Sequence, residues 1–195
     1  NQIQDTKPEL ISTMLDTTAI AETISYGIQS VRWSVLDDLD AEGLLLQPKG
    51  REPLANVVAI PDADQSPESL CGLGNGTAPE AQFARRLAEA GCRVLVPTMI
   101  NRTIRVFNPR RKNIRMSNRE FLHRSAFLMG RTLQGYEIQK TLAAVDWFSR
   151  NSDKRIGLVG WGEGGMLTLR AAALDTRIGA SFVSGHLGAM GTLWK

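Results

Sequence analysis

Residues that build metal and redox sites are scarce in this sequence. Cysteine occurs only twice in 195 residues, at Cys71 and Cys92. Two thiols are too few for a zinc site built from cysteines or for a framework of several disulfides. A single disulfide between the two stays open as an alternative, and we favour two free thiols.

Long apolar runs and a large net charge are also absent. The longest runs, such as Val57–Ile60 and Ile156–Val159, are far shorter than the roughly 20 residues that cross a bilayer. The formal net charge is only +3, which does not indicate a nucleic-acid partner. We therefore expect no membrane span and no binding to nucleic acid.

Charge is nevertheless concentrated between Arg102 and Arg131, a stretch called the basic segment below. It contains a single carboxylate, that of Glu120. Its cationic residues are Arg102, Arg105, Arg110, Arg111, Lys112, Arg115, Arg119, Arg124 and Arg131. This pattern favours a solvated or partner-facing loop, with a site for an anionic ligand or an acidic surface as the alternative.

The start of the chain has a helical pattern of apolar residues. Within residues 8–28, Pro8 suits a first helical turn, and apolar side chains recur at helical spacing afterwards. These apolar residues are Leu10, Met14, Leu15, Ile20, Ile24 and Ile28. We therefore expect residues 1–29 to form an N-terminal helical extension and residues 30–195 to form one main domain.

Strands and helices alternate in the main domain. Alternating residues over 31–36 and 41–47, separated by Asp37-Asp38, predict an antiparallel hairpin. Continuous apolar runs, typical of strands buried on both faces of a parallel sheet, follow at 56–60, 92–96, 155–159 and 178–183. Helices are expected at 79–91, at 118–150 with breaks near Gly130 and Gly135, and at 166–174. The predicted fold class is α/β, a doubly wound and mostly parallel sheet with an opening antiparallel hairpin.

A glycine-rich turn joins the third buried strand to the helix after it. Its sequence is Gly160-Trp161-Gly162-Glu163-Gly164-Gly165. It resembles the nucleophile elbow of α/β-hydrolases, in which small residues two positions before and after the nucleophile permit a sharp turn. The chain is more narrowly similar to the dienelactone hydrolase and acetyl xylan esterase branch, through Ala81–Gly91, Gly130–Leu133 and Ala171–Ile178.

This resemblance covers roughly residues 30–190 and implies an α/β-hydrolase fold. It implies carboxylic esters, acetylated sugars included, as the substrate class, and it favours a periplasmic or secreted location. It implies no cofactor. Because the acid and the histidine of the family follow the elbow on later loops, we expect this domain to lack its last strands and to be incomplete at its C-terminal end.

The elbow departs from the family at the nucleophile. Aligning Gly160 and Gly164 with the small positions places Gly162 where an active member has serine, and glycine has no side chain to attack an ester. Taking Glu163 as the nucleophile would put bulky Trp161 at a small position, so we expect Glu163 to pair with an arginine of the basic segment instead.

Neither histidine fits the base of a catalytic triad. His123 precedes the elbow and is expected on the surface, whereas His186 follows the very next strand, which is too early for the family's base. No Ser-His-Asp set can therefore be assembled from the chain.

The resemblance also implies where a crevice would lie. The strand ending at Ile60 should lie beside the strand ending at Val159, with the strand ending at Val183 on its other side, and ligands of such sheets bind at these carboxyl ends. The candidate binding residues are Asp62, Ala63, Asp64, Trp161 and His186. For Trp161, core packing is favoured over a pocket wall. Carboxylates and an imidazole could hold a cation there, but turn capping and salt bridges are favoured, so no metal is expected.

Three functions are compatible with these residues. The first is a degenerate hydrolase domain without ester chemistry that binds a ligand, such as a small ester or sugar, or a partner. The second is an esterase of the acetyl xylan esterase type that uses Glu163 or residues outside this chain. The third is a structural subunit, because the strand at 178–183 would leave an edge for further polypeptide or a partner chain to cover.

Overall fold

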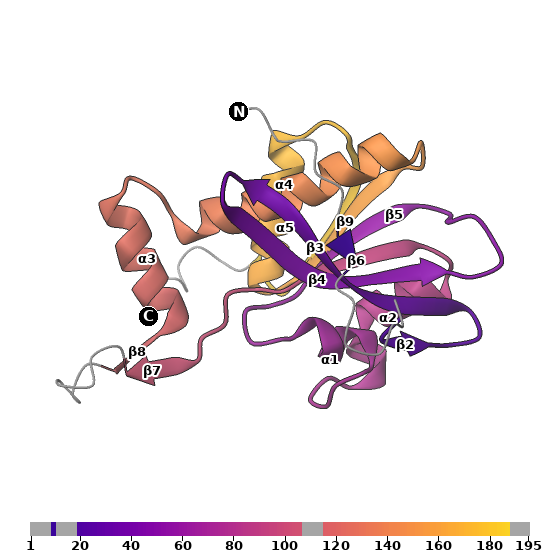
Figure 1. Ribbon diagram of the computed structural model, residues 1–195, viewed down its shortest axis with the longest axis horizontal. Coiled ribbons are helices and arrows are strands. Elements are labelled where there is room, and N and C mark those ends of the chain that lie inside the picture. The colour runs from indigo at the N-terminus through magenta and orange to yellow at the C-terminus, as the bar shows by residue number, and fades with distance from the viewer. Residues whose placement is uncertain (1–8, 11–18, 107–114, 188–195) are drawn as a thin grey trace.

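The computed structural model describes residues 9–10, 19–106 and 115–187. Within them one large sheet has the strand order β1-β3-β4-β6-β5-β9-β10, with β2 paired to β3, and a separate small sheet pairs β7 with β8 (Figure 1). The strands are β1 Glu9–Leu10, β2 Ala21–Glu22, β3 Tyr26–Leu36, β4 Leu39–Pro48, β5 Asn56–Ile60, β6 Arg93–Pro97, β7 Ile104–Val106, β8 Arg115–Ser117, β9 Ile156–Trp161 and β10 Ile178–Ser184. The helices are α1 Pro67–Cys71, the 3-10 turn η1 Pro79–Ala81, α2 Phe83–Glu89, α3 Asn118–Leu128, α4 Leu133–Asn151 and α5 Glu163–Leu174.

The opening hairpin is confirmed and is longer than the sequence predicted. β3 and β4 pair antiparallel from Tyr26↔Pro48 to Leu36↔Leu39. The turn between them is tight because Asp38 takes a positive φ of 60°, a conformation that aspartate tolerates better than most side chains do. The hairpin forms the antiparallel side of the sheet, since β4 also pairs antiparallel with β6.

The other side of the sheet is parallel. β5 lies between β6 and β9, and β10 pairs with β9 on the far side, all in parallel. The chain moves from β5 outward to β6 and then returns to β9 on the opposite side of β5. The strand order therefore reverses at β5 and β9, which is where an open α/β sheet has its crevice.

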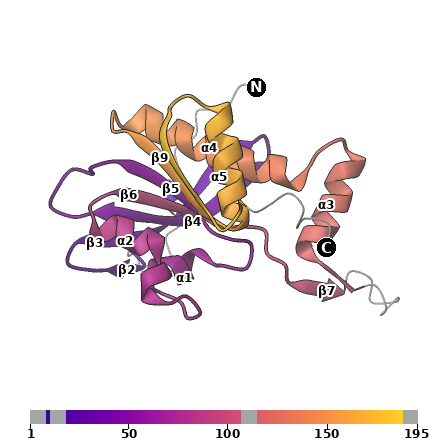
Figure 2. The same ribbon diagram turned by 180° about the vertical axis from the view of Figure 1, so that it is seen from behind.

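Helices cover both faces of the sheet (Figures 1 and 2). Because neighbouring strand residues point to opposite faces, β5 sends Val58 and Ile60 to the core beneath α4 and α5, and Val57 and Ala59 to the core beneath α1 and α2. All five residues of β5 are buried. The fold is thus the predicted doubly wound α/β arrangement, with its apolar runs buried on both faces.

The long helical pattern at 118–150 is divided in two, as predicted. α3 ends at Leu128, and Gly130 takes a positive φ of 70° before Thr132 caps α4 by accepting a hydrogen bond from the N–H of Gly135. The break lies at Gly130, whereas Gly135 is inside the first turn of α4. Together α3, β7 and β8 project from one side of the sheet (Figure 1).

The N-terminal helix is not present in the described residues, so that part of the prediction is wrong. Ala21–Glu22 forms β2, and Tyr26 begins β3, in which Ile28 is 1% exposed. Ile20 and Ile24 lie outside the strands and are 51% and 103% exposed, so the helical spacing does not mark a buried face here. Pairing of β2 with β3 holds this part of the chain in the sheet instead. Residues 8 and 11–18 of the predicted helix lie outside the described residues.

Both cysteines are free thiols, as favoured from the sequence. Cys71 is the last residue of α1 and is buried in the core between the helices α1 and α2 and the sheet. Desolvation raises the pKa of its thiol to about 12, so it behaves as a core residue rather than a reactive one. Among the described residues, no helix is long and apolar enough to cross a membrane.

Candidate functional site

The candidate site lies at the carboxyl ends of β5, β9 and β10, where the strand order reverses. The predicted neighbours are confirmed: Ile60 pairs with Gly160 at the end of β5, and Val183 pairs with the same residue from the other side. The loop after Ile60 and the turn after Trp161 therefore lie side by side at this edge of the sheet.

Gly162 makes the sharp turn that joins β9 to α5. Its φ of 57° and ψ of −120° belong to a region that side-chain-bearing residues adopt only at a cost of about 1–3 kcal/mol. Its N–H donates to the carbonyl of Ser184 at 2.9 Å, and its carbonyl accepts from Met166 at 3.2 Å. The backbone at Gly162 thus makes the sharp strand-to-helix turn that the glycine-rich sequence predicted.

Two other glycines of the turn permit close contact between backbones. A Cβ added to Gly160 would overlap the carbonyl oxygen of Gly164. A Cβ added to Gly164 would overlap the carbonyl oxygen of Ile60. The first turn of α5 can therefore lie directly on the ends of β5 and β9, which requires glycine at both positions.

The carboxylate of Asp62 occupies the space above Gly162. A Cβ on Gly162 would lie 2.8 Å from Asp62 Cγ and 2.9 Å from Asp62 Oδ1, so this carboxylate fills the place of a nucleophile's side chain. Asp62 Oδ1 also accepts a hydrogen bond of 2.9 Å from the backbone N–H of Glu163. That carboxylate therefore caps α5 from a neighbouring loop, where the positive end of the helix favours it.

The backbone N–H of Glu163, at the turn, and that of Asp62, on the loop beside it, are both bonded to side chains. In an α/β-hydrolase elbow one donor is the N–H of the residue after the nucleophile, and the second comes from a loop after a neighbouring strand. Here the N–H of Glu163 is bonded to Asp62 Oδ1, and the N–H of Asp62 donates to Gln65 Oε1 at 3.1 Å. An ester carbonyl could reach these donors only by displacing side chains of the protein itself.

Glu163 is held by two arginines of the basic segment, as the sequence predicted for at least one. Arg119 forms an ion pair with Glu163 Oε1, and Arg102 Nη2 lies 3.3 Å from Glu163 Oε2. Arg102 also pairs with Asp64 at 2.5 Å, and this hydrogen bond raises the pKa of its guanidinium above the usual value. Glu163 is only 16% exposed at its side chain, so its carboxylate is committed to structure.

The remaining candidate residues differ in exposure. Ala63 is 2% exposed, and it lines a polar cavity of about 280 Å³ together with Asp64 and residues of the loops 65–68 and 98–103. Trp161 is 49% exposed, so the expected core packing is wrong. Its ring lies against Gly185, where an added Cβ would be 3.0 Å from Trp161 Cε2. It is the last residue of β9.

His186 is exposed. It lies beside the first turn of α5, as shown by the 3.4 Å between its Cβ and the position of a Cβ added to Gly165. His123 is exposed on α3, as expected, with its ring centroid 6.4 Å from that of Phe127. Within residues 9–10, 19–106 and 115–187, no three histidine, cysteine, aspartate or glutamate side chains are grouped so that they could hold a metal ion.

Comparison with known proteins decides the family. Residues 42–184, which are more than half of the chain, match the model of the dienelactone hydrolase family. The chain belongs to the dienelactone hydrolase family. A search of curated protein sequences finds no match.

Solved structures of dienelactone hydrolase relatives share the fold. A Bacteroides fragilis NCTC 9343 protein assigned as an acetyl xylan esterase superposes with a TM-score of 0.69 at 18% identity, over 92% of this chain and 48% of its own. Acetyl xylan esterase 1 from Thermoanaerobacterium sp. reaches 0.58 at 15% identity, over 93% and 55%. A dienelactone hydrolase-like promiscuous phosphotriesterase from metagenomic libraries reaches 0.53 at 18%, over 86% and 63%. The chain thus spans about half the length of the first of these structures.

In this member of the dienelactone hydrolase family, the sequence did not predict which residue the side chain of Asp62 contacts. Either Asp62 or Asp64 was expected to cap the next turn. Asp62 does accept a hydrogen bond from the N–H of Gln65 through its carbonyl, but its side chain reaches Glu163, which is 101 positions away. A carboxylate two residues beyond a buried strand was the only available signal, and it does not specify which neighbour the side chain will contact.

Proposed function

We propose that this member of the dienelactone hydrolase family is a non-hydrolytic domain that binds a ligand or a partner. The observation that carries the proposal is the carboxylate of Asp62 above Gly162, bonded to the N–H of Glu163. A hydrolase needs a nucleophile at that position and free donors for the developing oxyanion. This domain has neither, because Gly162 has no side chain and the donors are in use.

Electrostatics supports the same conclusion. Ester hydrolysis by an elbow nucleophile builds negative charge on the carbonyl oxygen, and catalysis depends on donors aimed at that charge. The carboxylate of Asp62 places negative charge at this point instead. This charge would repel an oxyanion. The N-terminus of α5, which could otherwise stabilise an oxyanion, is already bonded to the carboxylate of Asp62.

Catalysis by Glu163 is the weaker alternative. A carboxylate nucleophile must reach the reacting carbon, but both oxygens of Glu163 are paired, one with Arg119 and the other with Arg102. Releasing Glu163 would leave a cation on α3 without its partner. Since related structures are described as esterases, the proposed ligand class is a small ester or an acetylated sugar that is bound without being cleaved.

The test is hydrolysis of p-nitrophenyl acetate by the wild-type chain, Asp62→Asn and Glu163→Gln. We expect all three to hydrolyse the ester no faster than the same amount of heat-unfolded protein does. The comparison variant combines Gly162→Ser with Asp62→Ala. It supplies a serine at the turn and removes the carboxylate that the serine side chain would otherwise overlap. Wild-type turnover that disappears in Asp62→Asn or Glu163→Gln would overturn the proposal.

A second candidate function, binding of further polypeptide, is favoured by the edge at β10. In the described residues β10 pairs only with β9, and Phe182 on it is 61% exposed. An uncovered edge strand pairs readily with other chains. We therefore propose that a strand or a partner chain adds to β10.

The prediction for β10 concerns the purified 195-residue chain. We expect native mass spectrometry to find species heavier than the 21.4 kDa monomer, and we expect Phe182→Lys to shift the population toward the monomer because edge lysines oppose strand pairing. Arg155→Lys is the matched control, since Arg155 is exposed at the other end of β9. A wild-type chain that is entirely monomeric contradicts this prediction.

A further inference from the structure

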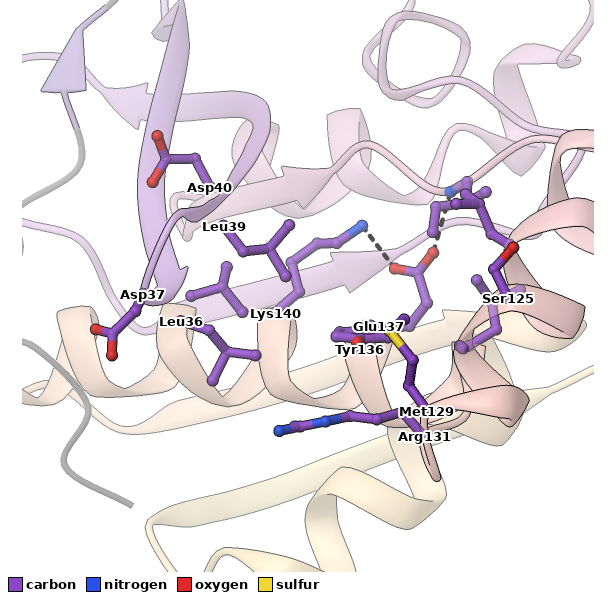
Figure 3. Close-up of a pocket in the computed structure, with 15 residues that line it drawn as sticks. Leu36, Asp37, Leu39, Asp40, Ser125, Met129, Arg131, Tyr136, Glu137 and Lys140 are labelled. Atoms are coloured by element: carbon purple, nitrogen blue, oxygen red, sulfur yellow. Dashed lines mark hydrogen bonds and ion pairs between the residues drawn. The ribbon is translucent and has the colours of Figure 1, made fainter.

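A larger cavity lies apart from the elbow, between the tip of the β3–β4 hairpin, α3 and the start of α4 (Figure 3). Its volume is about 660 Å³, which is within the roughly 300–1,000 Å³ of small-molecule sites. Most of its wall is apolar. The wall includes Val35, Leu36, Leu39, Ile100, Leu122 and Met129.

Two of the charged side chains that line the cavity, those of Glu137 and Lys140, neutralise each other. Glu137 is 1% exposed, and its Oε2 lies 2.6 Å from Lys140 Nζ. Glu137 Oε1 accepts a hydrogen bond of 3.0 Å from the N–H of Ile100, and Lys140 donates to the carbonyl of Thr98 at 2.6 Å. This pair therefore ties the loop after β6 to α4 and offers a ligand no net charge.

Arg131 is the one charged side chain on the wall that is left for a ligand. The carboxylates of Asp37 and Asp40 point away from the other lining residues, whereas Arg131 extends along one side of the cavity (Figure 3). Arg131 is exposed and makes no ion pair with the residues that the structure describes. The hydroxyl of Tyr136 is a further donor on the wall.

We propose that this cavity binds an amphipathic monocarboxylate, an acid with an alkyl chain of medium length. The chain would lie against the apolar wall, where its burial is favourable, and the carboxylate would pair with the guanidinium of Arg131, which matches carboxylate geometry. A cationic amphiphile meets repulsion from Arg131, and a short acid leaves the apolar wall empty. This cavity is separate from the turn at Gly162, and its ligand differs from the small ester or sugar proposed above, so the cavity proposal goes beyond the proposed function and does not depend on it.

The cavity wall is connected to the elbow by polar contacts. The carbonyl of Ile100 accepts a hydrogen bond of 2.7 Å from Arg119, and Arg119 in turn forms an ion pair with Glu163, next to Gly162. The N–H of Ile100 donates to Glu137 on the cavity wall. Ile100 is thus held from both sides. Glu163 therefore acts as a positioning residue for the wall of the cavity.

Isothermal titration calorimetry with decanoate, below its micelle concentration, tests the site. We expect one decanoate per chain, with acetate and decyltrimethylammonium binding at least about tenfold more weakly, because each lacks one of the two interactions. Equal binding of decanoate and decyltrimethylammonium would show that charge is not recognised and would overturn the proposal. So would the absence of decanoate binding.

Variants locate the binding. Arg131→Gln should weaken decanoate binding about fivefold to tenfold. Leu122→Asp should abolish binding, because it places a carboxylate on the apolar wall. Arg155→Gln, at the opposite edge of the sheet, is the control and should leave binding unchanged. Circular dichroism melting of each variant confirms that it is folded. Unchanged binding in both cavity variants, or loss in Phe182→Ser on β10 instead, overturns the proposal.

The two proposals fail separately. Ester turnover by the wild-type chain that needs Asp62 or Glu163 would overturn the non-hydrolytic function without removing decanoate from the cavity. Absence of decanoate binding in a chain without turnover would overturn the cavity site and leave the non-hydrolytic function standing.

Discussion

Gly160→Ala is expected to lower the free energy of unfolding by about 3 kcal/mol, at the upper end of the usual cost of overpacking a core. The added Cβ would overlap the carbonyl oxygen of Gly164 and lie 2.5 Å from Thr168 Oγ1, a side chain that is fully buried. Backbone atoms cannot rotate away as a side chain can. The start of α5 must therefore move off the end of β9, which would be measured by urea unfolding.

Gly157→Ala on the same strand is the matched control. There the added Cβ would lie 3.6 Å from the carbonyl oxygen of Ala180 and 3.9 Å from Val57 Cγ2, which are ordinary contacts. The free energy of unfolding should change by less than about 1 kcal/mol, and an increase is possible since alanine loses less chain entropy than glycine. Similar losses in the two variants would show that close packing at the elbow is not the cause.

Glu137→Ala is expected to cost about 3 kcal/mol of the free energy of unfolding, because removing one partner of a buried ion pair leaves the other uncompensated. The side chain of Lys140 is only 13% exposed. The N–H of Ile100 would also lose its acceptor. The loss would be measured by urea unfolding of the wild-type chain and the variant at neutral pH.

Two comparison variants separate the causes. Glu137→Gln keeps an acceptor for Ile100 and removes only the charge, so it should cost less than Glu137→Ala. Glu89→Ala removes a partner of Arg85 on the surface, where the two side chains are 42% and 45% exposed, and should leave the free energy of unfolding nearly unchanged because solvent screens such pairs. Equal losses for Glu137→Ala and Glu89→Ala would contradict the role assigned to burial.

Glycine is favoured at the three positions of the elbow for different physical reasons, and the spacing of the glycines does not show which reason applies to which position. Gly160 and Gly164 bring backbones together. Gly162 combines a positive φ with a carboxylate above it. The pattern in the sequence predicted a turn of this kind, but it could not distinguish an elbow that is vacant from one that is filled by Asp62.

Local patterns predicted most of the elements. The strands at 56–60, 155–159 and 178–183 are confirmed within a few residues by β5, β9 and β10, since continuous apolar runs bounded by turns have few other solutions. Near the N-terminus the same reasoning was wrong, because the spacing of apolar residues does not show that they are buried, and Ile20 and Ile24 are exposed. Pairing of β2 with β3 decided the outcome there.

The candidate site was predicted only in part. Gly162 at the nucleophile position and the pairing of Glu163 with the basic segment follow from residue types and order along the chain. Which arginines pair with Glu163 depends on where the long connection between β6 and α4 passes the sheet, and Arg102 and Arg119 are the two that reach it. The exposure of Trp161 likewise depends on tertiary packing. Residue spacing carries no information on that path.

The sequence by itself determined that the chain is an α/β domain, that it resembles the dienelactone hydrolases, and that a glycine stands at the centre of its glycine-rich turn, since these follow from local apolar patterns and residue identity. Only the tertiary structure decided that Asp62 occupies the elbow and that a cavity opens beside Arg131. Both depend on contacts between segments far apart in the chain, and such contacts are set by how strands and helices pack together.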